Sequence, residues 1–325
     1  MPKRWAVPGA LLLLAGFMWA NNTGLWAGEE GAAGVLAHRG LAQTFDVEGI
    51  GNDTCTAELI HPPEHGYLEN TLDGMRAAFD TGADTVEFDV HRTADDQFAV
   101  FHDAGLDCRT DLSGSPADHT MEELRAADIG DGYTADNGRT HPFRGEGVGL
   151  MPELGDVLDG FPDRSLLLHV KAENPEEGEL LADRLSALPP ERLDLITVYG
   201  GDAPVAVLRE QVPGLRVMSK QLMLDCLVRY EAVGWTGYVP RDCRGIQLHI
   251  PEGYGPWLWG WPEKFTQRMA GADTRVVLVA GSGGFSEGFD TPGSVDRVPA
   301  GFTGLVWTNR ADLTAEAILA RGAGD

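Results

Sequence analysis

Ionisable side chains stand within or at the ends of short apolar runs in the first third of the chain. His38 and Arg39 close the run GVLAHRG, and His102 closes the run FAVFH. Glu87 and Asp89 alternate within TVEFDVHRT, so both carboxylates point to the same face of a strand. Two such groups repel each other unless a cation lies between them, and Mg²⁺ or Ca²⁺ takes oxygen ligands of this kind. We therefore expect a divalent-metal site at this pair, with a surface ion pair as the alternative.

Two histidines flank these carboxylates along the sequence. A single histidine after an apolar run is more often structural. A pair that lies on either side of a metal site can instead supply a general base and a general acid. His38 and His102 are therefore the expected proton-transfer groups.

The elements that must position these residues alternate between strand-like and helix-like patterns from Gly34 onward. Eight short apolar runs read as buried parallel strands, namely GVLAHRG, TVEFDVHRT, SLLLHVKA, LDLITVYG, LRVMSK, GIQLHI, RVVLVAG and GLVWTN. Helical patterns fall between most of them, which predicts an α/β fold, a (β/α)8 TIM barrel over residues 34–325. In such barrels the site lies at the carboxyl ends of the strands.

Two segments are longer than ordinary connections, from Leu41 to Leu68 and from Asp107 to about Leu150. The second contains one helical pattern, TMEELRAAD. Both follow strands that carry the expected site residues. We therefore predict two long insertions near the active-site face, of the kind that form lids or binding loops.

The charge of the chain limits its partners. Its 50 acidic residues outnumber 25 basic ones, so the formal net charge is −25. Such a surface repels nucleic acid, which we exclude as a partner. It also repels a phosphate group, so a phosphate-binding site needs cations of its own. A small-molecule substrate is the expected partner, and the oligomeric state is left open.

The N-terminus has the pattern of an export signal. Lys3 and Arg4 precede an apolar run from Trp5 to Ala20. Cleavage after Ala20 or Ala27 would leave large residues three positions before the cut, so residues 1–28 are either a cleaved signal peptide or an N-terminal membrane anchor. We expect an exported protein, periplasmic or extracellular. Both forms stay open, and with them membrane association through residues 5–27.

Four cysteines lie outside the N-terminal segment. Their spacing is not that of a zinc knuckle, and an even number in an exported chain favours two disulfides. Of the three connectivities we favour Cys55–Cys108 with Cys226–Cys243, since Cys55 and Cys108 each follow an expected site segment. Free buried thiols are the alternative.

The motifs together resemble a known family. AHRG, ENT, VEFDVHRT, VFHD, LMPELGDVL and LLLHVK stand in the order of the corresponding motifs of the glycerophosphodiester phosphodiesterases. The clear resemblance runs from Gly34 to about Ala172, and beyond it the likeness is one of architecture.

The resemblance implies a metal-dependent phosphodiesterase on a (β/α)8 barrel, with the following roles carried over motif by motif. His38 and His102 become the acid–base pair; Glu87 and Asp89 become metal ligands; Arg39 and Lys171 become phosphate contacts; Glu69 becomes a metal ligand or a neighbour of Arg39. In the family mechanism a hydroxyl of the substrate attacks phosphorus, and water then opens the cyclic phosphate.

Two positions depart from the family pattern. The third metal ligand is normally a glutamate, whereas LLLHVK places His169 there. Imidazole suits transition metals better than Mg²⁺ or Ca²⁺, so His169 ligates a different metal, holds a water on the metal, or marks the loss of a ligand with weakened activity. Near the end of the chain, Asn309 stands where the family has aspartate, and Trp307 either lines the substrate site or only packs.

We therefore expect hydrolysis of phosphodiesters, foremost glycerophosphodiesters, to glycerol phosphate and an alcohol. One alternative is a phospholipase D-like lyase that acts on intact lipid. The other is a barrel that has lost catalysis and binds a phosphate ligand, which the departures at His169 and Asn309 motivate.

Overall fold

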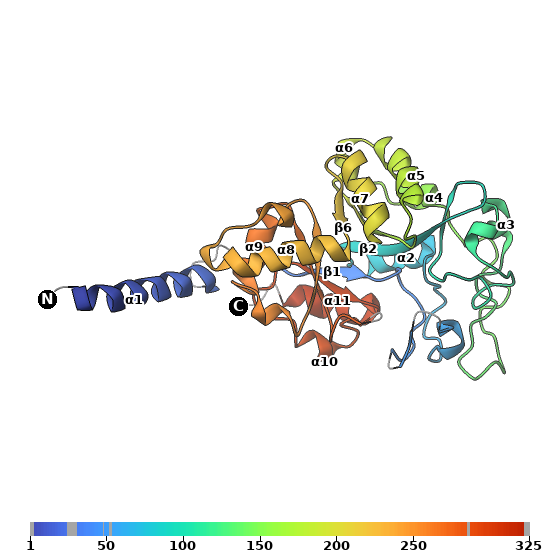
Figure 1. Ribbon diagram of the computed structural model, residues 1–325. Helices are drawn as coiled ribbons and strands as arrows, with labels where there is room; N and C mark the ends of the chain where they lie inside the picture. The colour runs from blue at the N-terminus through green and yellow to red at the C-terminus, as the bar shows by residue number, and fades with distance from the viewer. Residues whose placement is uncertain (1–2, 25–30, 48, 52–53, 285–286, 322–325) are drawn as a thin grey trace.

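Eight parallel strands form a nearly closed barrel in the computed structural model, which describes residues 3–24, 31–47, 49–51, 54–284 and 287–321 (Figure 1). The strand order is β6-β5-β4-β2-β1-β9-β8-β7, and a single bridge between Val217 and Ile246 links the two ends. The predicted TIM barrel is thus confirmed, and each of the eight runs forms a strand: β1 (Gly34–Ala37), β2 (Thr85–Arg92), β4 (Ser165–Val170), β5 (Ile196–Gly200), β6 (Arg216–Met218), β7 (Gln247–Pro251), β8 (Arg275–Val279) and β9 (Leu305–Thr308).

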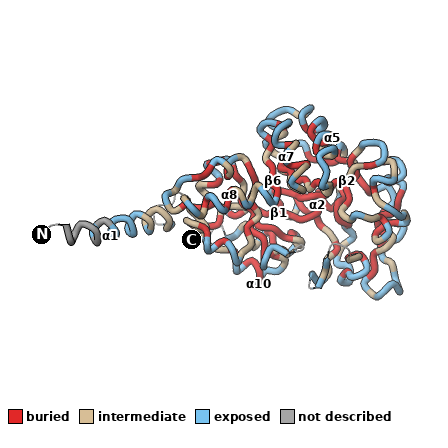
Figure 2. The backbone as a smooth tube through the Cα atoms, in the orientation of Figure 1, coloured by how far each residue is buried: buried red, intermediate tan, exposed pale blue. Residues whose placement is uncertain are grey.

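Helices cover the outside of the barrel, as the alternating pattern predicts (Figures 1 and 2). Side-chain caps begin several of them: Thr71, Asn174 and Ser219 each accept a backbone N–H of the first turn. The barrel helices are α2 (Leu72–Asp80), α5 (Pro175–Ser186), α6 (Pro190–Leu193), α7 (Asp202–Gln211), α8 (Lys220–Val233), α9 (Glu263–Ala270), α10 (Pro292–Val295) and α11 (Ala311–Ala320).

Strand register decides which side chains face the barrel axis. Asp89 pairs with His169, and His169 pairs with Tyr199, so these three lie in one layer. On the other side of the barrel Leu36 pairs with Trp307. Side chains alternate between the two faces of a strand. Glu87, His249 and His38 therefore also point toward the barrel axis. The barrel mouth is therefore built from alternate residues of separate strands.

The two long insertions form a substructure with its own core beside the mouth. The insertions contain η2 (Thr56–Leu59), η3 (Pro116–Asp118) and α3 (Met121–Ala126), and they pack beside β3 (Phe98–Val100), which pairs antiparallel with β2. Helix α4 (Leu154–Gly160) follows the second insertion and buries Leu154 and Val157 in the barrel core. Leu106, Leu124, Tyr133 and Met151 are buried within the substructure. The predicted disulfide Cys55–Cys108 joins the two insertions, and Cys226–Cys243 joins α8 to η5 (Arg241–Cys243), so both predicted pairs are confirmed.

The N-terminal segment forms helix α1 (Lys3–Asn22), which projects away from the barrel (Figure 1). Its last turn contacts the barrel: Asn22 Nδ2 donates to the carbonyl oxygen of Trp235, and Arg268 donates to Asn22 Oδ1. Within the described part of the chain, no helix is both long enough and apolar enough to cross a membrane. The second cleavage position considered above, after Ala27, lies outside the described residues.

Candidate active site

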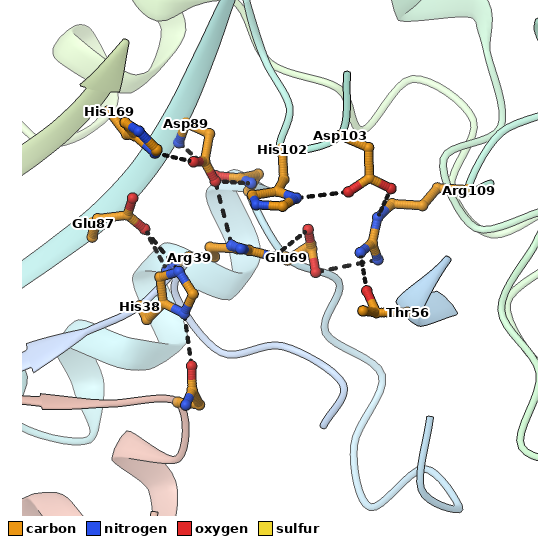
Figure 3. Close-up of polar contacts among 12 residues, drawn as sticks. His38, Arg39, Thr56, Glu69, Glu87, Asp89, His102, Asp103, Arg109 and His169 are labelled. Atoms are coloured by element: carbon orange, nitrogen blue, oxygen red, sulfur yellow. Dashed lines mark hydrogen bonds and ion pairs between the residues drawn. The ribbon is translucent and has the colours of Figure 1, made fainter. Parts of the chain in front are cut away.

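Two buried carboxylates on β2 form the centre of the barrel mouth (Figure 3). The side chains of Glu87 and Asp89 are 0% and 1% exposed. The backbone N–H of Arg39 donates to Glu87 Oε2 at 3.1 Å, and Arg39 Nε lies 3.4 Å from Asp89 Oδ2. His169 Nδ1 and Lys171 Nζ lie 2.8 and 3.5 Å from Asp89 Oδ1. The expected metal ligands and phosphate contacts therefore converge on one point.

The two carboxylates do not ionise alike. Burial, reinforced by the charge of Asp89, raises the pKa of Glu87 to about 8. Burial also opposes ionisation of Asp89, but the positive charge of Lys171 and of the groups beside it keeps that pKa well below its usual value. The protein's own cations therefore neutralise one carboxylate and leave the other short of positive charge.

The donor set fits a divalent cation. Glu87, Asp89 and His169 each offer a ligand atom within 4.8 Å of the others. Two carboxylate oxygens and one imidazole nitrogen form a mixed set that transition metals accept as well as Mg²⁺ or Ca²⁺. His169 is held against β5 by its ring, which stacks on Tyr199 at 4.1 Å, while the Tyr199 hydroxyl donates to Glu87 Oε1 at 2.7 Å. His169 therefore stands where the family has the third ligand and offers a nitrogen to the cluster.

His38 is oriented by an amide and a carboxylate behind it. Its Nδ1 lies 2.6 Å from Asn309 Oδ1, and Asn309 Nδ2 in turn donates to Asp290 Oδ2 at 2.7 Å. With the amide nitrogen committed to Asp290, its oxygen faces His38, which places the imidazole proton on Nδ1. Burial, together with the charge of Arg39, keeps the pKa of His38 well below its ordinary value. The ring is therefore neutral at pH 7, with the Nε2 lone pair toward the mouth.

His102 is oriented in the same way by a carboxylate. Its Nδ1 lies 2.6 Å from Asp103 Oδ1, and Arg109 Nε donates to Asp103 Oδ2 at 2.8 Å (Figure 3). Burial, together with Arg39, lowers the pKa of His102. The carboxylate of Asp103 nevertheless stabilises an imidazolium whenever a proton arrives, and Arg109 keeps that carboxylate ionised.

Arg109 links both insertions to the site. Its guanidinium is buried and reaches Glu69 Oε2 at 3.2 Å and the Tyr133 hydroxyl at 2.7 Å, and it donates to Thr56 Oγ1. Thr56 follows Cys55, and Arg109 follows Cys108, so the disulfide fixes the two backbones that carry this contact. Glu69 Oε1 accepts from Arg39 at 3.3 Å on its other side. The structure therefore places Glu69 between two arginines, outside the cluster of Glu87, Asp89 and His169.

The backbone at the mouth contains two left-handed residues. Arg39 and Asn70 both have φ of 58°, a conformation that costs free energy in residues other than glycine. Asn70 then clamps Asp89, because its Nδ2 donates to Asp89 Oδ2 at 3.1 Å and its Oδ1 accepts from the Asp89 N–H at 3.0 Å. Gly40 follows at φ 76°, and a Cβ there would lie 2.8 Å from the backbone of α2.

All nine residues predicted from the sequence lie at this mouth. Trp307 is 6% exposed and its ring lies 4.6 Å from that of His38, so it packs on His38. The functional residues that sequence reasoning missed are Asn70, Asp103, Arg109, Tyr199, His249 and Asp290. The motifs ENT and VFHD contain two of them, but the others come from segments far apart in sequence.

The raised pKa of Glu87 leads to a prediction about the pH dependence of the stability of the metal-free protein. A carboxyl group whose pKa rises on folding, here from 4.5 to about 8, costs stability as the pH rises through that interval. Glu87→Gln does not ionise. In chelator, its free energy of unfolding relative to wild type should therefore increase between about pH 5 and about pH 8, by on the order of a few kcal/mol.

Thermal and urea unfolding of both proteins across this range measures the effect. Glu179→Gln, which changes an exposed glutamate of α5, serves as the control and should follow the wild-type pH dependence. Parallel curves for wild type and Glu87→Gln would show that Glu87 ionises normally in the folded protein.

Comparison with known proteins supports a family assignment. Residues 38–188 match the sequence model of the Glycerophosphoryl diester phosphodiesterase family. A glycerophosphodiester phosphodiesterase from Bacillus altitudinis is 34% identical over 33% of this chain and 41% of its own length. A putative glycerophosphodiester phosphodiesterase from Bacillus subtilis is 34% identical over 37% of this chain and 46% of its own length. The chain thus spans less than half the length of these curated relatives.

The likeness of the fold covers more of the chain. A glycerophosphoryl diester phosphodiesterase domain from Mycobacterium tuberculosis superposes with a TM-score of 0.60 over 90% of this chain and 98% of its own, at 17% identity. The region matched by the family model contains the motif residues from His38 to Lys171 described above. Residues 38–188, which are just under half of this chain, therefore resemble the glycerophosphoryl diester phosphodiesterase family whose model they match.

Proposed function

We propose that the protein is a divalent-metal-dependent phosphodiesterase that hydrolyses glycerophosphodiesters to glycerol phosphate and an alcohol. One observation carries this proposal: two histidines, each oriented through Nδ1, flank a buried carboxylate pair and two cations. Binding alone has little need of two oriented proton-transfer groups, so the arrangement favours catalysis over a phosphate-binding role.

His38 is the proposed base. With Nδ1 hydrogen-bonded to Asn309, the Nε2 lone pair, 3.8 Å from Glu87 Oε2, is the atom that takes a proton from the substrate hydroxyl that attacks phosphorus. A new P–O bond forms as the bond to the leaving alcohol breaks. In the second step water adds to the phosphorus of the cyclic phosphate, and the bond to the oxygen that attacked in the first step breaks. His38 Nε2 returns the proton to that oxygen, which restores the substrate hydroxyl.

His102 is the proposed acid. Asp103 stabilises the imidazolium, so His102 can deliver a proton to the departing alcohol oxygen and later take one from the attacking water. Arg39 and Lys171 are placed to contact the phosphate oxygens, where charge accumulates. A divalent cation held by Glu87, Asp89 and His169 would supply further neutralisation of that charge. Because His169 contributes nitrogen, we propose that a transition metal such as Mn²⁺ supports activity alongside Mg²⁺ and Ca²⁺.

The first test is hydrolysis of glycerophosphocholine by the full chain with Mg²⁺, Ca²⁺, Mn²⁺ or chelator. We expect release of glycerol phosphate that chelator abolishes. His38→Ala and His102→Ala should each lower kcat by roughly 100- to 10,000-fold, the range that general acid–base catalysis contributes. His169→Glu should shift the preference from Mn²⁺ toward Mg²⁺ or Ca²⁺.

Two outcomes would contradict the proposal. Folded wild type that cleaves no phosphodiester with any of these metals excludes the enzyme. A gain of activity in His169→Glu from an inactive wild type would mean that the third ligand has been lost and that the natural role is binding.

The contacts of Arg109 lead to a separate prediction, that this residue positions His102 and Arg39. It orients His102 through Asp103 and supports Arg39 through Glu69, yet it is buried away from the carboxylate pair. Arg109→Met should therefore lower kcat by roughly 10- to 100-fold, as losses behind active groups do, with a smaller change in KM.

Arg109→Lys retains the charge but cannot reach four partners at once, so it should recover only part of kcat. Arg139→Met, an exposed arginine of the same insertion, is the matched control. Unfolding curves establish that each variant is folded at the assay temperature. An unchanged kcat in folded Arg109→Met would remove Arg109 from the catalytic machinery.

A second candidate function, phospholipase D-like action on a lysolipid, is favoured by a cavity beside His38. This cavity of about 220 Å³ is walled on its apolar side by Ala42, Phe45, Val47 and Leu313. An apolar cavity of about 150 Å³ holds a benzene molecule, so the space suffices for part of an acyl chain. His38 lines the same cavity, which connects it with the proposed reacting groups.

Leu313→Ser tests this candidate. The ratio of kcat/KM for lysophosphatidylcholine to that for glycerophosphocholine should fall by about threefold to tenfold, because an apolar contact to the chain is lost. Leu224→Ser, which changes an exposed leucine of α8, should leave the ratio unchanged. No hydrolysis of the lysolipid below its micellar concentration, with glycerophosphocholine cleaved normally, excludes the candidate.

We also propose that the protein is exported, with residues 5–27 as the segment that meets the membrane. Two disulfides support an oxidising compartment, and Lys3 and Arg4 precede the apolar part of α1. N-terminal sequencing of the protein from its host distinguishes a cleaved signal from a retained segment.

A further inference from the structure

We propose that the site selects phosphodiesters whose alcohol carries a quaternary ammonium group, and that the rings of Tyr199, His249 and Trp307 bind this cation. The inference rests on the proposed function and names the substrate class for the same site. The three rings, defined here as the aromatic wall, stand on β5, β7 and β9.

The aromatic wall completes a continuous row of rings around the mouth. Centroid distances are 5.5 Å from Tyr199 to His249 and 5.4 Å from His249 to Trp307. The row continues at one end to His169, at 4.1 Å from Tyr199, and at the other to His38, at 4.6 Å from Trp307. It therefore starts at a candidate metal ligand on β4 and ends at the proposed base after β1, and its middle stands on β5, β7 and β9.

Strand register explains why the rings share one side. Tyr199 pairs with His169 across β4 and β5, and Trp307 pairs with Leu36, which lies in the barrel interior. Tyr199 and His249 are only partly buried, so their rings border the open mouth. A group that extends from a phosphate at Arg39 and Lys171 toward this side meets ring surfaces.

The aromatic wall is electrically suited to a cation. Burial lowers the pKa of His249 to about 3, so the ring is neutral at pH 7 and does not repel positive charge. Ring faces attract a cation through their quadrupoles. The site's own cations lie with the carboxylates: Lys171 and Arg39 contact Asp89 on β2.

Hydrogen bonding separates quaternary from primary ammonium groups. The aromatic wall offers few acceptors: the Tyr199 hydroxyl, which donates its proton to Glu87, keeps only its oxygen lone pairs, and His249 Nε2 already lies 2.9 Å from Gln247 Nε2. Trp307 offers only a donor. A primary ammonium needs acceptors for three N–H groups and would find too few at this wall, whereas a trimethylammonium has no N–H to satisfy.

Binding of phosphocholine and of 3,3-dimethylbutyl phosphate tests the proposal, because the second ligand replaces the charged nitrogen by carbon at nearly the same shape. Calorimetry on the full chain with Mn²⁺ should give a Kd for phosphocholine about threefold to thirtyfold lower than for its neutral analogue. Phosphoethanolamine should bind more weakly than phosphocholine.

His249→Leu and Trp307→Leu should each bring the ratio of the two Kd values toward unity, since they remove ring faces and keep apolar surface. Trp257→Leu, which changes a tryptophan that is 78% exposed, is the matched control and should keep the wild-type ratio. Two variants on different strands guard against a local folding defect in one of them.

The outcomes separate this inference from the proposed function. A wild-type ratio near unity, or no binding of either phosphate, overturns the quaternary-ammonium preference even if glycerophosphodiesters are hydrolysed. A ratio in the expected range that His249→Leu and Trp307→Leu abolish supports it even if hydrolysis fails, because binding is measured without turnover.

Discussion

Two carboxylates that are fully buried side by side are the constraint on which the rest of the site depends. Glu87 and Asp89 stand one strand period apart with almost no contact with water. An unpaired buried charge is expensive, so neighbouring elements must supply compensation. Asp89 is contacted by three such groups: Arg39 from the end of β1, Lys171 from the end of β4 and the Asn70 amide before α2. Even so, Glu87 keeps a raised pKa, which leaves room for one more positive charge.

A second layer behind these contacts comes from the insertions. The barrel strands place the carboxylates and rings, but His102 and its partner Asp103 follow β3, outside the barrel. Arg109 fixes them from within the insertion core, and the same guanidinium holds Glu69 against Arg39. The two proposed proton-transfer groups are thus supported by different parts of the chain: His38 by the carboxyl end of β9, and His102 by the insertions.

Periodicity and motif order predicted the barrel well because both are local properties. All eight strands follow from runs visible in the sequence, and the disulfide connectivity favoured among the three possible ones is the one that forms. The sequence showed β3 only as an apolar run. Its antiparallel pairing with β2 could not be predicted, because the direction of pairing depends on the path of the chain that follows. The support of His38 by Asn309 joins positions 271 residues apart, and the aromatic wall depends on the register of three strands. Such contacts have no local signature.

The disulfide between the insertions has a consequence for how the protein is produced. Neither Cys55 nor Cys108 belongs to the barrel core, which lies between the strands and the outer helices. A chain that lacks only the Cys55–Cys108 bond can therefore complete its barrel while the insertion that carries Arg109 is untethered, and a reducing cytoplasm withholds this bond together with Cys226–Cys243 of the barrel core. Circular dichroism would report such material as folded. An assay that detects no activity in such material would reflect reduced cysteines rather than the active site. The reaction must therefore be tested on secreted or oxidatively refolded protein.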